Sequence, residues 1–226
     1  MTPRRGQLVL DLGHRQALGR EDFLVAPCNA EAVAWIDRWP GWPGPALALS
    51  GPAGCGKTHL ARVWQAASGA RRLARADIAG AAEMLLAGAA HALVEDADAP
   101  GDDAALFHLY NHVAGRGGTL LFCAAAAPAR WPVGLADLAS RLRAMPVAAI
   151  GAPDDALLEA VLAKHFADRQ LRIRADVLRY LVPRMERSFA AARALAEALD
   201  RAALAEGRTV TVPLARRVLG EDAGAD

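Results

Sequence analysis

Short runs of apolar residues alternate along the first two thirds of the chain with segments in which apolar residues recur every three or four positions. The short runs predict β-strands at 46–49, 71–75 (the weakest), 92–95, 119–123 and 147–150. The periodic segments predict helices, because residues three and four apart share one helix face; they cover 31–39, 57–67, 78–87, 102–114 and 135–144. Uniformly apolar strands separated by helices are typical of a parallel sheet covered on both faces. The pattern therefore predicts an α/β fold with a five-stranded parallel sheet between helices.

The pattern changes after Pro153, where strand-like runs stop. Helical periodicity continues at 154–167, 175–182, 188–205 and 213–219, which predicts a separate all-helical subdomain. We therefore expect three parts: a flexible N-terminal segment at 1–20, an α/β core at 21–151 and a helical subdomain at 152–226.

Composition excludes several classes of protein. The 226 residues carry 26 Lys+Arg against 25 Asp+Glu, a net charge of +1. Autonomous sequence-specific DNA binding usually needs a basic excess, and is not expected here. No run approaches the roughly 20 apolar residues of a membrane span, so no membrane contact is expected. The three cysteines lack CxxC spacing, which favours reduced thiols and a cytoplasmic location.

The strongest chemical signal follows the strand at 46–49 and precedes the helix at 57–67. The segment GPAGCGKT fits the phosphate-loop pattern GxxxxGK[ST], in which backbone N–H groups and a helix N-terminus surround phosphates. One of only two lysines in the chain falls in it. We expect ATP or ADP with Mg²⁺ to be bound by Gly51, Pro52, Ala53, Gly54, Cys55, Gly56, Lys57, Thr58 and His59.

A phosphate loop of this kind works with an acidic strand end that holds magnesium and orients the attacking water. Glu95 and Asp96 follow the apolar strand at 92–94 and supply the acidic groups. We expect both to be catalytic, with Glu95 and Thr58 holding Mg²⁺.

Several motifs, taken in order, resemble AAA+ ATPases of the bacterial replication initiator (DnaA) type, and most of all the Hda-type regulatory inactivators of the initiator. They are Phe23-Leu-Val with Asn29, GPAGCGKT, LVED at 93–96, DLASRL at 137–142 and Thr211-Val-Pro-Leu. The resemblance spans nearly the whole chain and implies a AAA+ P-loop NTPase core with a C-terminal helical lid. It implies adenine contacts from Phe23, Leu24, Val25 and Asn29, and an arginine finger, Arg141, acting on ATP bound to another molecule.

The N-terminal segment Gln7-Leu-Val-Leu-Asp-Leu12 is similar to the peptide by which Hda-type proteins bind the sliding clamp of DNA polymerase. Alternate leucines alone also fit an ordinary edge strand. The resemblance implies that Gln7, Leu8, Leu10 and Leu12 hold the clamp, lying extended in a hydrophobic pocket.

The chain departs from the family where ATP hydrolysis is concerned. Ala124–Ala127 lack the polar side chain that usually follows this strand, and Ala190 stands where the family carries an arginine. Arg187 and Arg193 lie about one helical turn away, and either could replace it. Glu95 stands where Asp is commoner. These changes touch charge stabilisation and water positioning, so we expect weak intrinsic hydrolysis.

The favoured hypothesis is a nucleotide-bound regulator that docks on the clamp and stimulates hydrolysis of initiator-bound ATP through Arg141. One alternative is a self-sufficient AAA+ ATPase that loads or remodels a replication protein. Another is a recruiting factor without hydrolysis-stimulating activity. The sequence leaves open whether ADP or ATP is the working ligand, and whether the chain is a monomer, a homodimer or a filament.

Overall fold

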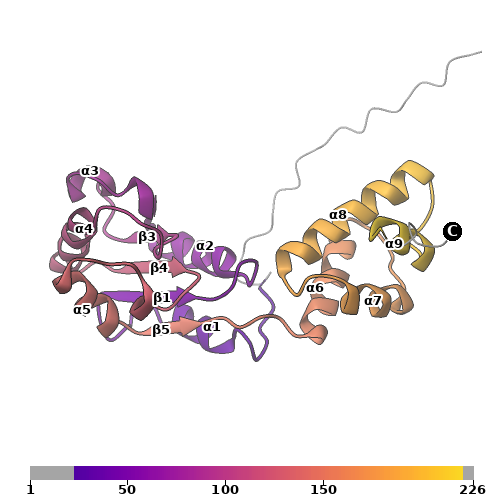
Figure 1. Ribbon diagram of the computed structural model, residues 1–226, viewed down its shortest axis with the longest axis horizontal. Coiled ribbons are helices and arrows are strands. Elements are labelled where there is room, and N and C mark those ends of the chain that lie inside the picture. The colour runs from indigo at the N-terminus through magenta and orange to yellow at the C-terminus, as the bar shows by residue number, and fades with distance from the viewer. Residues whose placement is uncertain (1–22, 221–226) are drawn as a thin grey trace, which may run out of the picture.

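A five-stranded parallel sheet and a group of C-terminal helices make up the computed structural model, which describes residues 23–220 (Figure 1). The strands are β1 (Ala46–Ser50), β2 (Arg71–Ala74), β3 (Ala92–Glu95), β4 (Leu120–Ala124) and β5 (Val147–Ala149). Their order in the sheet is β2-β3-β4-β1-β5, and every neighbouring pair is parallel. The predicted α/β class is confirmed.

Helices cover both faces of the sheet, which explains why β1, β3, β4 and β5 are largely apolar, while the edge strand β2 begins with two exposed arginines. One face, called here the α2 face, packs against α1 (Ala30–Asp37) and α2 (Lys57–Ser68). The other packs against α3 (Ala82–Leu86), α4 (Asp103–Gly115) and α5 (Ala136–Ala144). Successive strand residues point to opposite faces, so in β1 the leucines 47 and 49 enter one core and the alanines 46 and 48 the other.

The predicted helix at 78–87 is too long. A 3₁₀ turn (Arg75–Asp77) comes first, and α3 begins only at Ala82. Gly80 lies between them at φ +79°, a backbone conformation that ends helical periodicity and that glycine adopts without penalty.

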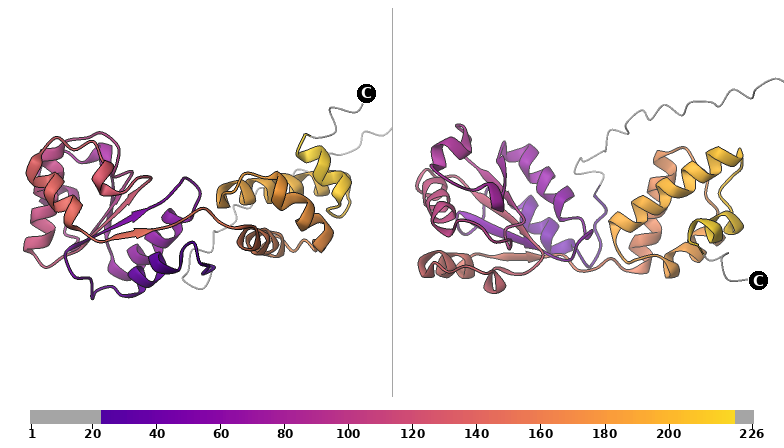
Figure 2. Two further views of the ribbon diagram at one scale, coloured as in Figure 1. Left: turned by 60° about the horizontal axis from the view of Figure 1, so that its bottom comes forward. Right: turned by 45° about the horizontal axis from the view of Figure 1, so that its top comes forward.

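The C-terminal helices are α6 (Asp155–Asp168), α7 (Ala175–Leu181), α8 (Phe189–Glu206) and α9 (Val212–Val218). They pack around an apolar core of their own, formed by residues from 158 to 215. Side chains of Asp154, Ser188 and Thr211 accept hydrogen bonds from the first turns of α6, α8 and α9, which fixes where these helices begin. The first turn of α8 is the part of the lid nearest the sheet in all views (Figures 1 and 2).

No helix within residues 23–220 is long and apolar enough to cross a membrane.

Candidate nucleotide site

The phosphate loop occupies residues 51–56, between the end of β1 and the start of α2. Gly54 and Gly56 have φ of +69° and +99°, conformations that turn backbone N–H groups toward the inside of the loop. Helix α2 begins at Lys57 without a side-chain cap. The N–H groups of its first turn therefore face the loop unpaired by any cap, and the helix dipole favours an anion there.

Close packing explains two of the glycines. A Cβ atom on Gly51 would lie 2.4 Å from the Ile150 carbonyl oxygen and 2.8 Å from Cys55 Sγ. A Cβ atom on Gly54 would lie 2.8 Å from the Cβ of Ser188, which belongs to the lid. The loop is thus confined between the end of β5 and the N-terminus of α8.

Lys57 folds back over this loop. Its ammonium donates to the carbonyl oxygens of Gly51 at 2.7 Å and Pro52 at 2.8 Å. The charge is therefore held on the concave side of the loop, where a phosphate enters.

The segment before α1 borders the same loop. Phe23 is buried, meets the His59 ring edge-on at a centroid distance of 5.3 Å, and lies next to Gly56. The Asn29 side chain accepts from the Ala26 N–H at 2.8 Å and donates to the Leu24 carbonyl at 2.9 Å. Asn29 therefore shapes residues 24–26, and Val25 stands 54% exposed at the rim.

The lid contacts the loop directly. The Phe189 N–H donates to the Gly54 carbonyl at 2.8 Å, and the Cβ of Ala190 faces Gly54. Arg187 pairs with Asp155 at 2.8 Å, and Arg193 lies 3.7 Å from Glu197. Both arginines considered as replacements for the lid arginine are therefore engaged within the lid, while the position that faces the loop is alanine.

Acidic groups gather at the carboxyl ends of the strands. Burial, together with the nearby charges of Glu95 and Asp96 and opposed by Lys57, raises the pKa of the Cys123 thiol to about 12. These charges therefore surround Cys123 at one edge of the sheet. Glu95 pairs with Arg72, whose Nε donates to Glu95 Oε2 at 2.6 Å and whose Nη2 contacts the same oxygen. Asp96 is exposed at φ +50°.

The cradle fits an anionic phosphate chain, because glycines, N–H groups and an ammonium converge on it. A divalent cation fits less well. The Thr58 hydroxyl is exposed on the first turn of α2, as a metal ligand should be. Glu95, however, already pairs with Arg72 through Oε2, so the charge of the carboxylate expected to hold the metal is partly compensated.

The segment after β4 offers no side chain for aligning water. The backbone N–H groups of Ala125 and Ala126 both donate to Asp98 Oδ2 at 3.0 Å. Their hydrogen bonds are therefore directed away from the phosphate loop and into a neighbouring loop.

Arg141 lies elsewhere. It is exposed on α5, with its guanidinium carbon 5.2 Å from the Phe107 ring and 5.6 Å from the Tyr110 ring, both on α4. Helices α4 and α5 lie toward the end of the core remote from the lid, whereas the strand ends that carry the phosphate loop point to the lid (Figure 1). Arg141 therefore lies against α4, on the face of the sheet opposite α2, the helix that follows the phosphate loop.

Sequence reasoning missed Arg72 and the lid residues Ser188 and Phe189. Arg72 joins the site only because β2 pairs with β3, and no local pattern signals that pairing. Gln7, Leu8, Leu10 and Leu12 lie outside the described residues.

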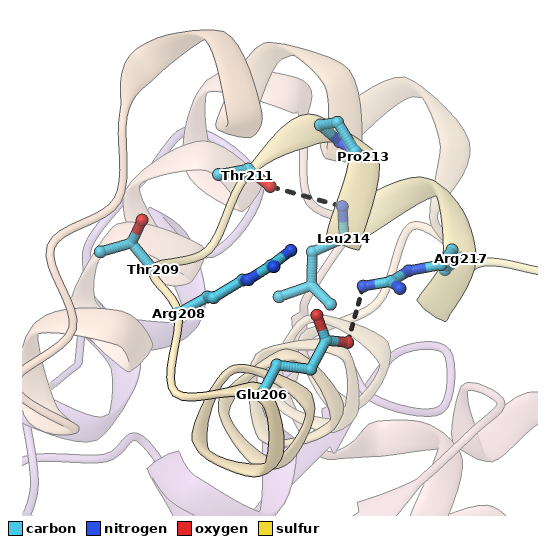
Figure 3. Close-up of a pocket in the computed structure, with 7 residues that line it drawn as sticks. All are labelled: Glu206, Arg208, Thr209, Thr211, Pro213, Leu214 and Arg217. Atoms are coloured by element: carbon cyan, nitrogen blue, oxygen red, sulfur yellow. Dashed lines mark hydrogen bonds and ion pairs between the residues drawn. The ribbon is translucent and has the colours of Figure 1, made fainter.

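A hollow between the end of α8 and α9 lies at the far end of the lid from the phosphate loop (Figure 3). The Arg217–Glu206 ion pair, at 2.6 Å, spans it, and the Thr211 hydroxyl accepts from the Leu214 N–H beside it. These contacts tie α9 to α8, and none of the residues predicted for the nucleotide site lines the hollow.

Comparison with known proteins agrees with this architecture. Residues 154–219 match the model of the Hda lid domain. Domain III of the replication initiation protein DnaA from Thermotoga maritima superposes with a TM-score of 0.77 at 19% identity, over 92% of this chain and 98% of that one. AMPPCP-bound DnaA from Aquifex aeolicus gives 0.64 at 16% identity, over 78% of this chain and 63% of that one.

The Holliday junction branch migration motor RuvB of Thermotoga maritima gives a TM-score of 0.68 at 11% identity, over 92% of this chain and 74% of that one. No curated protein sequence matches the chain. The C-terminal part of the chain is thus similar to the Hda lid domain, and the chain as a whole shares the fold of DnaA domain III.

Proposed function

We propose that this chain is a nucleotide-bound regulator of replication initiation, which stimulates hydrolysis of ATP bound to the initiator DnaA. Arg141 carries the proposal. It is an exposed arginine, steadied by two aromatic rings of α4 on the face of the sheet opposite α2. An arginine in this setting is suited to reach a nucleotide on a neighbouring molecule, and arginine fingers supplied in trans accelerate hydrolysis by about 10³–10⁵-fold.

The chain's own site also supports a protein that binds a nucleotide but hydrolyses it poorly. The phosphate loop, Lys57 and the start of α2 are suited to hold a nucleotide. The positions that would stabilise charge during hydrolysis are alanine, at 124–127 and at 190. The bound nucleotide would then act as a structural ligand that keeps the lid and core together.

The N-terminal segment completes the proposal. Gln7, Leu8, Leu10 and Leu12 would tether the protein to the sliding clamp on DNA, which raises its effective concentration near the initiator. Head-to-tail docking of two AAA+ faces would then bring Arg141 to the initiator's ATP.

The deciding experiment is single-turnover hydrolysis of labelled ATP preloaded on DnaA, with the full chain and with clamp loaded on DNA. We expect clamp-dependent acceleration that Arg141→Ala and Leu8→Ala each abolish. Arg143→Ala is the matched control, because Arg143 is an exposed arginine on the same helix.

Each other outcome favours a different function. Clamp binding without acceleration would replace the proposal with a recruiting factor. Rapid ATP turnover by the isolated chain, lost in Asp96→Asn, would replace it with a self-sufficient ATPase.

A further inference from the structure

We propose that Arg72 takes the place of the divalent cation in this nucleotide site, so that the chain binds its nucleotide without magnesium. The inference rests on the proposed binding of nucleotide at the phosphate loop. It goes further by naming the residue that sets the metal requirement.

Strand pairing places Arg72 at the site. Ala74 of β2 pairs with Glu95 of β3, and Arg72 pairs with Leu93. Residues two apart on a strand share a face, so Arg72 and Glu95 both lie on the α2 face, the face of the helix that follows the phosphate loop. Because β2 is the edge strand, the guanidinium stays 48% exposed while the Glu95 side chain is only 16% exposed.

The charges explain why Arg72 is needed. Glu95 is half-buried at the end of β3 and is followed by the exposed Asp96, and a cation beside two neighbouring carboxylates favours their charged forms. In a magnesium-dependent site the metal supplies it. Here Arg72 does, since two guanidinium nitrogens contact Glu95 Oε2. The hydrogen bond to Glu95 also raises the pKa of Arg72, so the guanidinium keeps its charge.

The test is a fluorescence titration of the full-length protein with N-methylanthraniloyl-labelled ADP and ATP, each in Mg²⁺ and in EDTA. We expect the affinity for each labelled nucleotide to differ by less than about twofold between the two buffers. Arg72→Gln frees Glu95 and should make labelled ADP bind about tenfold or more tightly in Mg²⁺ than in EDTA, the size of effect seen when groups around a metal ligand change. Arg71→Gln removes an arginine of the same strand from the opposite face, and should behave like the wild type.

The outcomes separate the two proposals. Absence of nucleotide binding in both buffers would overturn the nucleotide site itself. A wild-type affinity that falls about tenfold or more in EDTA would overturn the role of Arg72 while leaving the site intact. As a second measurement, free Mn²⁺ is followed by electron paramagnetic resonance. The wild-type complex should sequester no more Mn²⁺ than ADP does alone, and additional tight binding would also overturn the inference without recourse to a variant.

Discussion

The side chains of Trp39, Thr119 and His91 form a hydrogen-bonded network that requires His91 to be neutral. Trp39 Nε1 donates to Thr119 Oγ1 at 3.0 Å, and the Thr119 hydroxyl lies 2.9 Å from His91 Nδ1. The backbone N–H of Thr119 donates to the same Nδ1 at 3.0 Å. Nδ1 must therefore be unprotonated, and burial lowers the pKa of His91 from its ordinary value.

This histidine predicts that the protein loses stability in mild acid. Because the pKa is lowered in the folded state, the unfolded chain binds more protons below about pH 6.5, and the free energy of unfolding falls as the pH falls. Urea midpoints at pH 7.5 and 5.5 should show this loss, and His91→Gln should reduce it. Burial lowers the pKa of His165 as well, so part of the slope should remain.

His108→Gln provides the control for that experiment, because His108 is exposed on α4. Identical slopes for wild type and His91→Gln would show that His91 does not titrate as described.

The crowding at Gly51 gives a second prediction. Gly51→Ala places a methyl group against the Ile150 carbonyl and Cys55 Sγ, so we expect about 1–3 kcal/mol of destabilisation together with weaker nucleotide binding. Gly44→Ala, where no atom lies within 4 Å of the added Cβ, should leave the urea midpoint nearly unchanged. Equal effects of the two substitutions would contradict a packing role for Gly51.

At the scale of residues, site residues can be predicted from the sequence where they belong to one contiguous motif. The phosphate loop could be placed because its glycines and Lys57 are contiguous, and the loop does adopt the turns that the pattern requires. Arg72 could not be placed, since its partner lies 23 residues away and the contact depends on which strands are neighbours.

At the scale of the elements, the ion pair between the buried Arg75 and Asp103 fixes the position at which α5 begins. Arg75, 2% exposed, donates to Asp103 Oδ1 at 2.7 Å and to the Asp102 carbonyl at 3.0 Å. The other oxygen of Asp103 accepts from the Gly134 N–H at 2.7 Å, just before α5. The end of β2, the start of α4 and the approach to α5 are therefore joined through one carboxylate.

Asp103→Ala should be costly for this reason. It leaves the Arg75 charge buried without its carboxylate, which destabilises a protein by about 3–5 kcal/mol. Urea unfolding measures the loss, and Asp77→Ala, an exposed aspartate of the same 3₁₀ turn as Arg75, is the control. A loss of less than about 1 kcal/mol, the size typical of exposed pairs, would show that the pair is effectively solvated.

Apolar periodicity located most elements but could not find this junction. A charged residue in a polar-looking stretch carries no periodic signal, so Arg75 was predicted as the end of a weak strand at 71–75, ahead of a helix at 78–87. The structure instead uses a 3₁₀ turn that buries Arg75, and Gly80 delays α3.

For the whole molecule, the separate apolar core of the lid leads to a prediction about folding. The lid core contains no residue of the sheet. A fragment of residues 152–220 should therefore be helical by circular dichroism and unfold cooperatively on heating, although its small size makes it only marginally stable. Leu199→Asp, at a fully buried position of α8, should abolish the transition. A fragment without cooperative unfolding would show that the lid requires the core.

Alternation of strands and helices was sufficient to predict the α/β class and the helical C-terminal part. The strand order could not be predicted, because β1, β3, β4 and β5 are all largely apolar and several orders would bury them equally well. The position of the lid on the core could not be predicted from the sequence either, because it depends on a backbone contact at Gly54 and not on a side-chain pattern.

The hydrogen bond between the Phe189 N–H and the Gly54 carbonyl determines how the attachment of the lid responds to ionic strength. A lid linked to phosphate by an arginine loosens as ionic strength rises, because mobile ions screen exposed charges. Here the link is a backbone hydrogen bond reinforced by the Phe189 ring packed on Gly56. The coupling between nucleotide binding at the loop and the position of α8 should therefore persist in concentrated salt. It should also persist in the dense layer of counterions that surrounds DNA.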